Sequence, residues 1–273
     1  MNRIMALAYI TFLDGLRRNA VWGLCIFALL CEVCGVFFID FFGHDLGRAI
    51  SDFQSSIMWA AGMIFILFYA VQALAWDDAH RNIDSILARP ISRTEYVLGS
   101  MAGLSLLLLC FEFLLFSLAW IEISWIRPHI GEVYFPVFSV SHFIATWLAL
   151  QVILLTHLSI VVLVSAVIRG AFPVMLITLA YSLICSGLPV VRESLHQQQH
   201  ADALTHGLDS MLQVMSMVFP DFSKLDWKDS VLSHQSLQSI IGMPAWLPFG
   251  LIGIYLSVIL FLACIIYQRR DIL

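Results

Sequence analysis

The chain has 273 residues, of which 60% are hydrophobic and 12% are charged, and its formal net charge is −5. Soluble domains carry roughly a quarter charged residues, so this composition excludes a water-soluble globular fold. The basic residues occur singly or in pairs, which excludes the basic patch of a nucleic-acid-binding protein. The composition therefore predicts a membrane protein.

The first segment, residues 1–19, has an amphipathic pattern. Its apolar positions recur at helical spacing: Ile4, Ala8, Phe12 and Leu16. Charged side chains fall on the rest of the helix surface, so the pattern favours a helix that lies along the membrane surface. A disordered tail is the alternative.

Six later stretches are apolar over the roughly 20 residues that a helix needs to cross the hydrocarbon core of a bilayer. They are Ala20–Phe42, Ile57–Trp76, Val97–Ile121, Phe143–Ile168, Ala171–Val191 and Trp246–Tyr267. The fold class is therefore an all-α polytopic membrane protein with six transmembrane helices. Arginine is concentrated in the tails and short loops on one side, which predicts that both termini are cytoplasmic.

The loop between the second and third predicted spans, residues 77–96, is the most heavily charged short segment. Residues 79–88 favour a short helix, Pro90 ends it, and Ser92 can cap the helix that follows. A soluble partner could dock on this cytoplasmic loop, although a polar loop without a partner has the same composition. The candidate docking residues are Asp77, Asp78, Arg81, Asp84, Arg89, Pro90, Arg93 and Glu95.

The segment 192–245, between the fifth and sixth predicted spans, is a large extracytoplasmic loop. Apolar residues from Leu204 to Phe219 recur at helical spacing and predict an amphipathic helix that ends at Pro220. His196, His200 and His206 are weak candidates for a metal site, and a solvated polar turn explains them as well. We therefore assign no metal site here.

Three polar residues inside the predicted spans are candidates for a translocation path: Glu112, Gln151 and His157. Ionisable groups at membrane depth are rare and often functional. Glu112 could line the path, pair with His157 or pack as a protonated group between helices. A hydrogen-bonded packing contact is an equally good explanation for each residue.

Three stretches resemble the type-2 ABC transporter permease family. RPISRTEYVLGS, at Arg89–Ser100, is similar to the family's segment entering the third helix. TFLDGLRRNAVW, at Thr11–Trp22, resembles its surface helix and the start of its first span. VFPDFSKLDWKD, at Val218–Asp229, resembles a proline-containing stretch before its last helix. Together with the six spans, the resemblance extends over nearly the whole chain.

The resemblance implies that the whole chain, residues 1–273, is one permease domain of an exporter in a bacterial inner membrane. Two such subunits, identical or paralogous, would work among membrane lipids with two ABC ATPase subunits. Residues 77–93 would form the coupling helix, and the second and fifth spans would line the central cavity. ATP and Mg would bind the ATPase, and we expect no cofactor on this chain, which has no G-x-x-x-x-G-K-[ST] motif.

Two other functions remain open at this point. One is an intramembrane lipid-modifying enzyme that uses Glu112 and His157. The other is a membrane scaffold, without transport, in an envelope or pilus assembly complex. The sequence does not identify the transported substrate.

Overall fold

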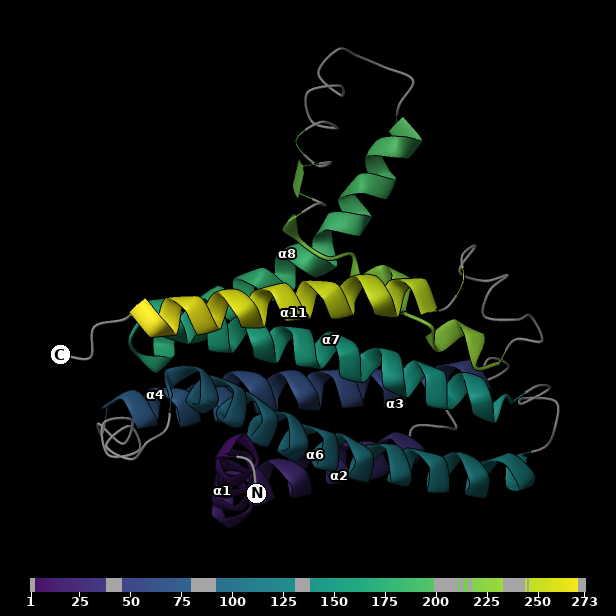
Figure 1. The fold of residues 1–273 in the computed structure, drawn as a ribbon. Helices are drawn as coiled ribbons and strands as arrows, with labels where there is room; N and C mark the ends of the chain where they lie inside the picture. The colour runs from purple at the N-terminus through teal and green to yellow at the C-terminus, as the bar shows by residue number, and fades with distance from the viewer. Residues whose placement is uncertain are drawn as a thin grey trace.

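The computed structural model describes residues 3–37, 46–79, 92–130, 138–198, 211, 214–215, 218–232, 244 and 246–269. Almost all of these residues are helical, and no strand occurs among them. Long helices run side by side in a bundle, and a shorter N-terminal helix crosses them at one end (Figure 1). The all-α class predicted from the sequence is confirmed for this part of the chain.

The N-terminal segment forms two helices, α1 (Arg3–Arg17) and α2 (Asn19–Phe37), with a bend of 66° between them. Arg18 separates them, and its backbone N–H donates to the Gly15 carbonyl at 3.1 Å. The indole of Trp22 donates to the Leu16 carbonyl at 2.8 Å and joins the two helices across the bend. The predicted helix before the first span is thus present, and its position at a membrane surface stays a prediction.

The second span is longer than its apolar core. Helix α3 (Leu46–Ile64) continues through the π-helical turn η3 (Phe65–Ala70) into α4 (Val71–Ala79). Hydropathy alone predicted a start at Ile57, because the preceding turns carry polar residues. Two of these, Ser51 and Gln54, are buried, so packing against other helices extends α3 beyond its apolar part.

The remaining long helices are α6 (Arg93–Ile130), α7 (Val140–Val167), α8 (Ala171–Gln198) and α11 (Trp246–Arg269). The predicted fourth and sixth spans agree with α7 and α11 to within three residues at each end. Helix α6 continues past the predicted end at Ile121, and α8 past Val191, because hydropathy marks the apolar part of a helix and not its end. Gly170, with φ of +106°, forms the tight turn between α7 and α8.

Five helical segments are long and apolar enough to cross a membrane. They are Gly47–Ala75, Arg93–Pro128, Val140–Val167, Ala171–Arg192 and Trp246–Arg269. The bent pair α1–α2 makes a sixth if it is counted as one span. The described structure therefore supports five or six spans.

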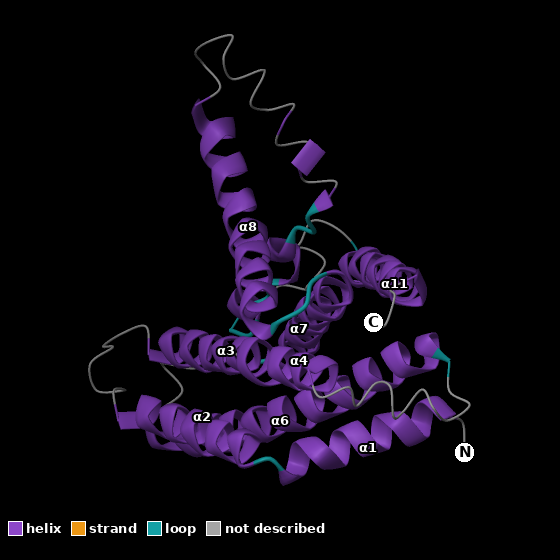
Figure 2. Cartoon of the chain, turned by 90° about the vertical axis from the view of Figure 1, so that its left-hand side faces the viewer, coloured by secondary structure: helices purple, strands orange, loops and turns teal. Residues whose placement is uncertain are grey.

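Helix α6 buries one face in the core. Leu104, Leu108 and Leu115 are completely enclosed there and pack with buried residues of η3 and α7. Helix α1 lies along the first turns of α6, and α2 and α3 lie beside the same helix (Figure 2). This packing holds the N-terminal helix against the spanning bundle.

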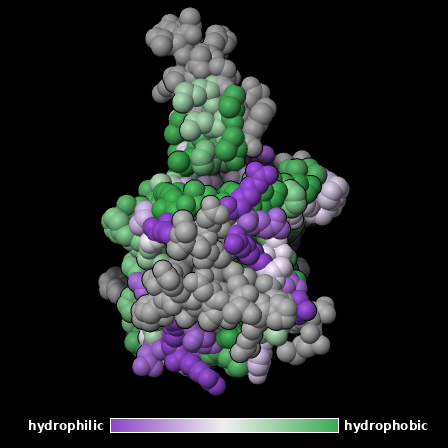
Figure 3. All heavy atoms as spheres, turned by 60° about the vertical axis from the view of Figure 1, so that its left-hand side comes forward, coloured by the Kyte–Doolittle hydropathy of each residue, from purple (hydrophilic) through white to green (hydrophobic). Residues whose placement is uncertain are grey.

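One end of the bundle brings together the start of α1, the start of α6 and the end of α11. The guanidinium of Arg93 donates to the Gln268 carbonyl at 2.9 Å, which fixes α6 to the last turn of α11. Hydrophilic residues gather on several sides of this end, whereas the projecting part of α8 is largely hydrophobic (Figure 3). The start of α1 and the end of α11 thus lie at the same, polar end of the bundle.

Candidate translocation site

A cavity of about 640 Å³ lies between α3, α7, α8 and a short segment with two 3-10 turns, η4 (Phe222–Leu225) and η5 (Lys228–Ser230). Its size is in the range usual for pockets that hold one small ligand. The cavity lies in the half of the bundle away from the chain ends, because α3 and α7 begin there. It is the main candidate site in the described structure.

One face of α7 forms the long wall of the cavity. Phe143, Trp147, Leu150 and His157 lie on this face and line the cavity. Their spacing of four, three and seven residues keeps them on one side of a helix. At 1.5 Å per residue, Phe143 and His157 are about 21 Å apart along the helix axis.

The segment from Asp221 to Val231, which contains η4 and η5, closes one side of the cavity. The Asp221 side chain accepts a hydrogen bond from the Ser223 N–H at 3.1 Å and begins η4. Three contacts then attach η5 and its flanking residues to the start of α7. Thr146 Oγ1 donates to the Trp227 carbonyl at 3.2 Å, His142 Nδ1 contacts the Ser230 carbonyl at 2.9 Å, and the Ser139 N–H donates to the Val231 carbonyl at 3.1 Å.

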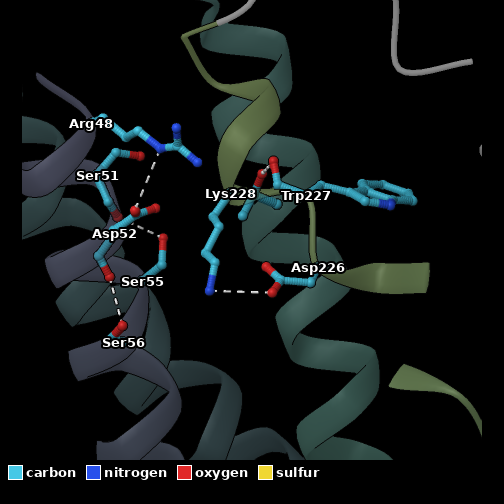
Figure 4. Close-up of polar contacts among 9 residues, drawn as sticks. Arg48, Ser51, Asp52, Ser55, Ser56, Asp226, Trp227 and Lys228 are labelled. Carbon is cyan, nitrogen blue, oxygen red and sulfur yellow. Dashed lines mark hydrogen bonds and ion pairs between the residues drawn. The ribbon is translucent and has the colours of Figure 1, made fainter. Parts of the chain in front are cut away.

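The cavity has a polar mouth between α3 and η5. Figure 4 shows Ser55 and Ser56 of α3 across a gap from Asp226 and Lys228, and the Lys228 ammonium pairs with Asp226 at 3.2 Å. The Ser55 and Ser56 hydroxyls donate to carbonyls of their own helix, at 2.8 and 2.7 Å. Each hydroxyl oxygen can still accept a hydrogen bond. The mouth therefore offers the Lys228–Asp226 pair and two hydroxyl acceptors, and the Arg48–Asp52 pair of α3 lies beside them (Figure 4).

His157 lies at the inner end of the cavity. Its ring is 5.2 Å from the ring of Phe222 and 5.6 Å from that of Tyr181, centroid to centroid. Its Nδ1 donates to the Ile153 carbonyl at 2.8 Å, since a carbonyl oxygen only accepts. Its Nε2 is buried and has no hydrogen-bond partner among the described residues. Of the three predicted path residues, the structure brings this one to the cavity.

Glu112 and Gln151 lie elsewhere, in the packed core. Both are buried, and the Gln151 side chain lies beside the Glu112 carboxyl group, so the structure brings these two predicted residues together. A Cβ on Gly62 of α3 would be 2.7 Å from Glu112 Oε1, so the carboxyl group is packed directly against α3. The pairing of Glu112 with His157 considered from the sequence is therefore not formed, because each side chain contacts a different part of the bundle.

Sequence reasoning missed a second buried polar pair, Gln54 and Glu122. The Gln54 amide donates to Glu122 Oε2 at 2.9 Å, and both side chains are buried between α3 and α6. Glu112, Leu115, Ala119 and Glu122 share one face of α6, so helical spacing could have revealed Glu122. It was missed because the predicted third span ended one residue before it.

The predicted coupling residues are only partly described. Arg81, Asp84, Arg89 and Pro90 lie outside the described residues, and Asp77 and Asp78 belong to the last turn of α4. Ser92 and Glu95 form a reciprocal cap at the start of α6: the Ser92 N–H donates to the carboxylate at 2.7 Å, and the Glu95 N–H donates to the Ser92 hydroxyl at 3.2 Å. The predicted cap at Ser92 is thus confirmed.

The extracytoplasmic histidines are also mostly outside the described residues. His196 belongs to α8, whereas His200 and His206 are not described. Within the described part of the chain, no group of three or more His, Cys, Asp or Glu side chains is placed to hold a metal ion. The amphipathic helix predicted from Leu204 to Phe219 is described only in part, and Met211, Val214, Met215 and Val218 are helical there.

These features define a helical membrane protein with several spans and a cavity enclosed by three of its helices. The chain matches the model of the ABC-2 family transporter protein over residues 5–272. Because this match includes nearly every residue, the chain belongs to that family, as the resemblance of its loop and terminal segments predicted. It is therefore a multi-pass membrane protein of a transport family. No curated protein matches the chain.

Proposed function

We propose that this chain is the membrane-spanning subunit of an ABC exporter that is driven by ATPase subunits on separate chains. The observation that carries the proposal is the cavity between α3, α8 and α7 in a chain of the ABC-2 transporter family. A transported molecule would occupy this cavity. The complex would contain two permease subunits, identical or paralogous, and ATP and Mg would bind to the ATPase.

In this proposal the chain has six spans, with both termini on the cytoplasmic side of a bacterial inner membrane. The arginine distribution supports it, since Arg3, Arg17, Arg93, Arg169 and Arg269 all belong to the end of the bundle that carries the chain ends. The cavity then lies in the extracytoplasmic half. The large loop between α8 and α11 lies on the same side.

Residues 77–96 would receive the motion of the ATPase. The described parts of this segment support a mechanical role, because it leads from the last turn of α4 into the capped start of α6. Arg93 also attaches α6 to α11, so movement at this point reaches several helices together. The candidate enzyme function has no such support, since Glu112 and His157 do not meet.

Charge reversal tests the coupling role. Because Arg93 has a structural contact with Gln268, Arg89→Glu is the cleaner single variant, and Arg89→Glu with Arg93→Glu is the stronger one. We expect the unchanged permease to stimulate its ATPase in liposomes, and we expect both variants to insert normally and to lose this stimulation. Arg127→Glu, near the other end of α6, is the matched control and should keep full stimulation. Normal stimulation and transport in the double variant would refute the coupling role.

Topology can be tested separately with Ser92→Cys on a background without the six native cysteines. A membrane-impermeant maleimide should label this position in inverted vesicles and not in intact cells. Labelling from outside the cell would contradict the proposed orientation and, with it, the coupling role of residues 77–96.

A further inference from the structure

The geometry points to a single-chain amphiphile with a zwitterionic headgroup as the ligand of this cavity. The inference rests on the proposed function only in treating that ligand as the transported molecule. It is carried by the shape of the cavity, by its sideways opening and by the charges at its mouth.

The shape favours an elongated, mainly apolar ligand. The α7 wall is about 21 Å long, which exceeds one leaflet of a hydrocarbon core about 30 Å thick. Aromatic side chains line this length: Phe143, Trp147, Trp59 and Phe222. A volume of about 640 Å³ is in the range for one drug-sized molecule, so the cavity holds one chain and its head, not a whole two-chain lipid.

The cavity opens sideways, between α3 and α8. Trp59 of α3 and Val190 of α8 both line it, and their side chains are also exposed, at 40% and 64%. Helix α8 packs against α4 and η3 near its beginning, and its second half projects away from the bundle (Figure 1). The cavity can therefore be reached from the side between α3 and α8, where a lipid-like molecule can enter from the bilayer.

The mouth has charges of both signs. Lys228 pairs with Asp226 at 3.2 Å, and both side chains are partly exposed, so this ion pair adds little stability and can be exchanged easily. A phosphate could bind Lys228 while an ammonium group binds Asp226 and the hydroxyl oxygens of Ser55 and Ser56. A purely anionic head would meet the Asp226 carboxylate, and an uncharged head would leave the Asp226–Lys228 pair intact and gain no charge-assisted contact with either group. Charge complementarity thus selects the zwitterion.

The polar mouth and the apolar wall follow each other along the cavity in the same order as the head and the acyl chain of such a ligand. Thr146 donates to the Trp227 carbonyl, so the Asp226–Lys228 pair lies beside the start of α7. His157, Phe222 and Tyr181 close the other end with ring contacts. A head at the mouth and a chain along α7 would bring each part of the ligand against groups of its own polarity.

Binding can be measured with the full-length protein in nanodiscs through quenching of tryptophan fluorescence. The probe is a lysophosphatidylethanolamine whose single acyl chain carries bromine, since three of the lining residues are tryptophans: Trp59, Trp147 and Trp227. We expect saturable quenching. Brominated lysophosphatidylglycerol and monoacylglycerol should each bind about tenfold more weakly, as expected for the loss of one charge-assisted contact.

Two pairs of variants test the site. Lys228→Gln should weaken binding about tenfold, whereas Lys224→Gln, which removes an equivalent lysine that pairs with Asp221 outside the cavity, should not. Ser186→Phe should fill the cavity and abolish saturable quenching, whereas Ser194→Phe, on the exposed part of α8, should have no effect. Circular dichroism and gel filtration check that each variant is folded.

The inference is overturned if the folded protein shows no saturable quenching, if all three heads bind equally, or if Lys228→Gln binds like Lys224→Gln. The failure of the proposed function would look different. In that case the zwitterionic probe would bind as expected, but no ATPase would be stimulated by the permease. Conversely, ATP-driven transport by a chain whose cavity does not bind the probe would refute only the inference.

Discussion

The attachment of α1 to α6 depends on two glycines that form a G-x-x-x-G motif, Gly99 and Gly103. A Cβ at position 103 would lie 2.6 Å from Thr11 Cβ and 2.7 Å from the Ala8 carbonyl oxygen, where ordinary contact begins at 3.4 Å. A Cβ at position 99 would lie 2.6 Å from Leu7 Cβ. Since a backbone oxygen cannot rotate away, Gly103→Ala must push α1 off α6. Close approach of helices through small residues is the usual basis of such motifs.

The free-energy cost of Gly103→Ala for the docking of α1 on α6 follows from two opposing effects. Overpacking of a well-packed contact costs about 1–3 kcal/mol. Alanine gains about 1 kcal/mol over glycine in a helix interior, so the net cost of Gly103→Ala is about 0–2 kcal/mol, and about 1.4 kcal/mol where the overpacking cost is in the upper part of its range. Because 1.4 kcal/mol corresponds to a factor of ten, the undocked fraction of α1 should rise about tenfold.

The docking equilibrium can be followed by the maleimide reaction of Leu7→Cys, whose side chain is buried against α6, on a background without native cysteines. Gly103→Ala should accelerate the reaction about tenfold. Gly250→Ala in α11 is the matched control, because a Cβ there meets no atom within 4 Å, and it should leave the rate unchanged while stabilising the fold slightly. Equal rates in the two variants would refute the close-packing argument.

Three further changes should alter the free energy of unfolding, measured by thermal or denaturant unfolding in detergent. Glu112→Leu combined with Gln151→Leu should leave the stability unchanged or raise it, because both members of a buried polar contact are replaced by apolar groups, and destabilisation would contradict this. Gln54→Leu should cost about 1–3 kcal/mol, since it leaves Glu122 without its donor, and an unchanged midpoint would contradict that. Ser92→Ala should cost about 1 kcal/mol through loss of the cap, whereas Ser117→Ala, whose hydroxyl bonds only within its own helix, should cost much less.

The sequence predicted the class of the fold because the bilayer sets a minimum apolar length for each helix. That argument located the centres of α7 and α11 well. It failed at the start of α3 and at the end of α6, since the bundle itself can bury polar residues such as Gln54 and Glu122 beyond the apolar core. Helix ends that depend on neighbouring helices cannot be obtained from hydropathy.

The candidate site was harder to predict for a related reason. His157 was singled out as a polar residue at membrane depth, and it does line the cavity. Glu112 was singled out by the same rule but packs in the core, because the rule does not show which face of a helix a residue occupies. The mouth at Asp226 and Lys228 depends on contacts between residues 146 and 227, and no local pattern reveals such a distant pairing.

The π-helical turn η3 links the proposed coupling end of the second span with its cavity wall. Trp59 lines the cavity before it, and Asp77 begins the coupling segment after it. A π-turn holds one residue more than an α-turn, and such turns are frequent at functional sites. We therefore expect the two halves of the span to turn relative to each other at this point.

Deleting Phe68, an exposed residue of this turn, should convert it to regular α-helix while both halves keep the faces that they bury. The variant should fold and bind its ATPase, but ATP-dependent changes in Trp59 fluorescence should be lost, because the straightened helix is stiffer. Deleting Leu114 in the regular helix α6 is the control: it rotates all later residues by about 100° and should prevent folding, since no π-turn can absorb the change. Loss of folding in both deletions alike would show that η3 only packs the core, and full coupling without Phe68 would show that the span transmits motion as a rigid rod.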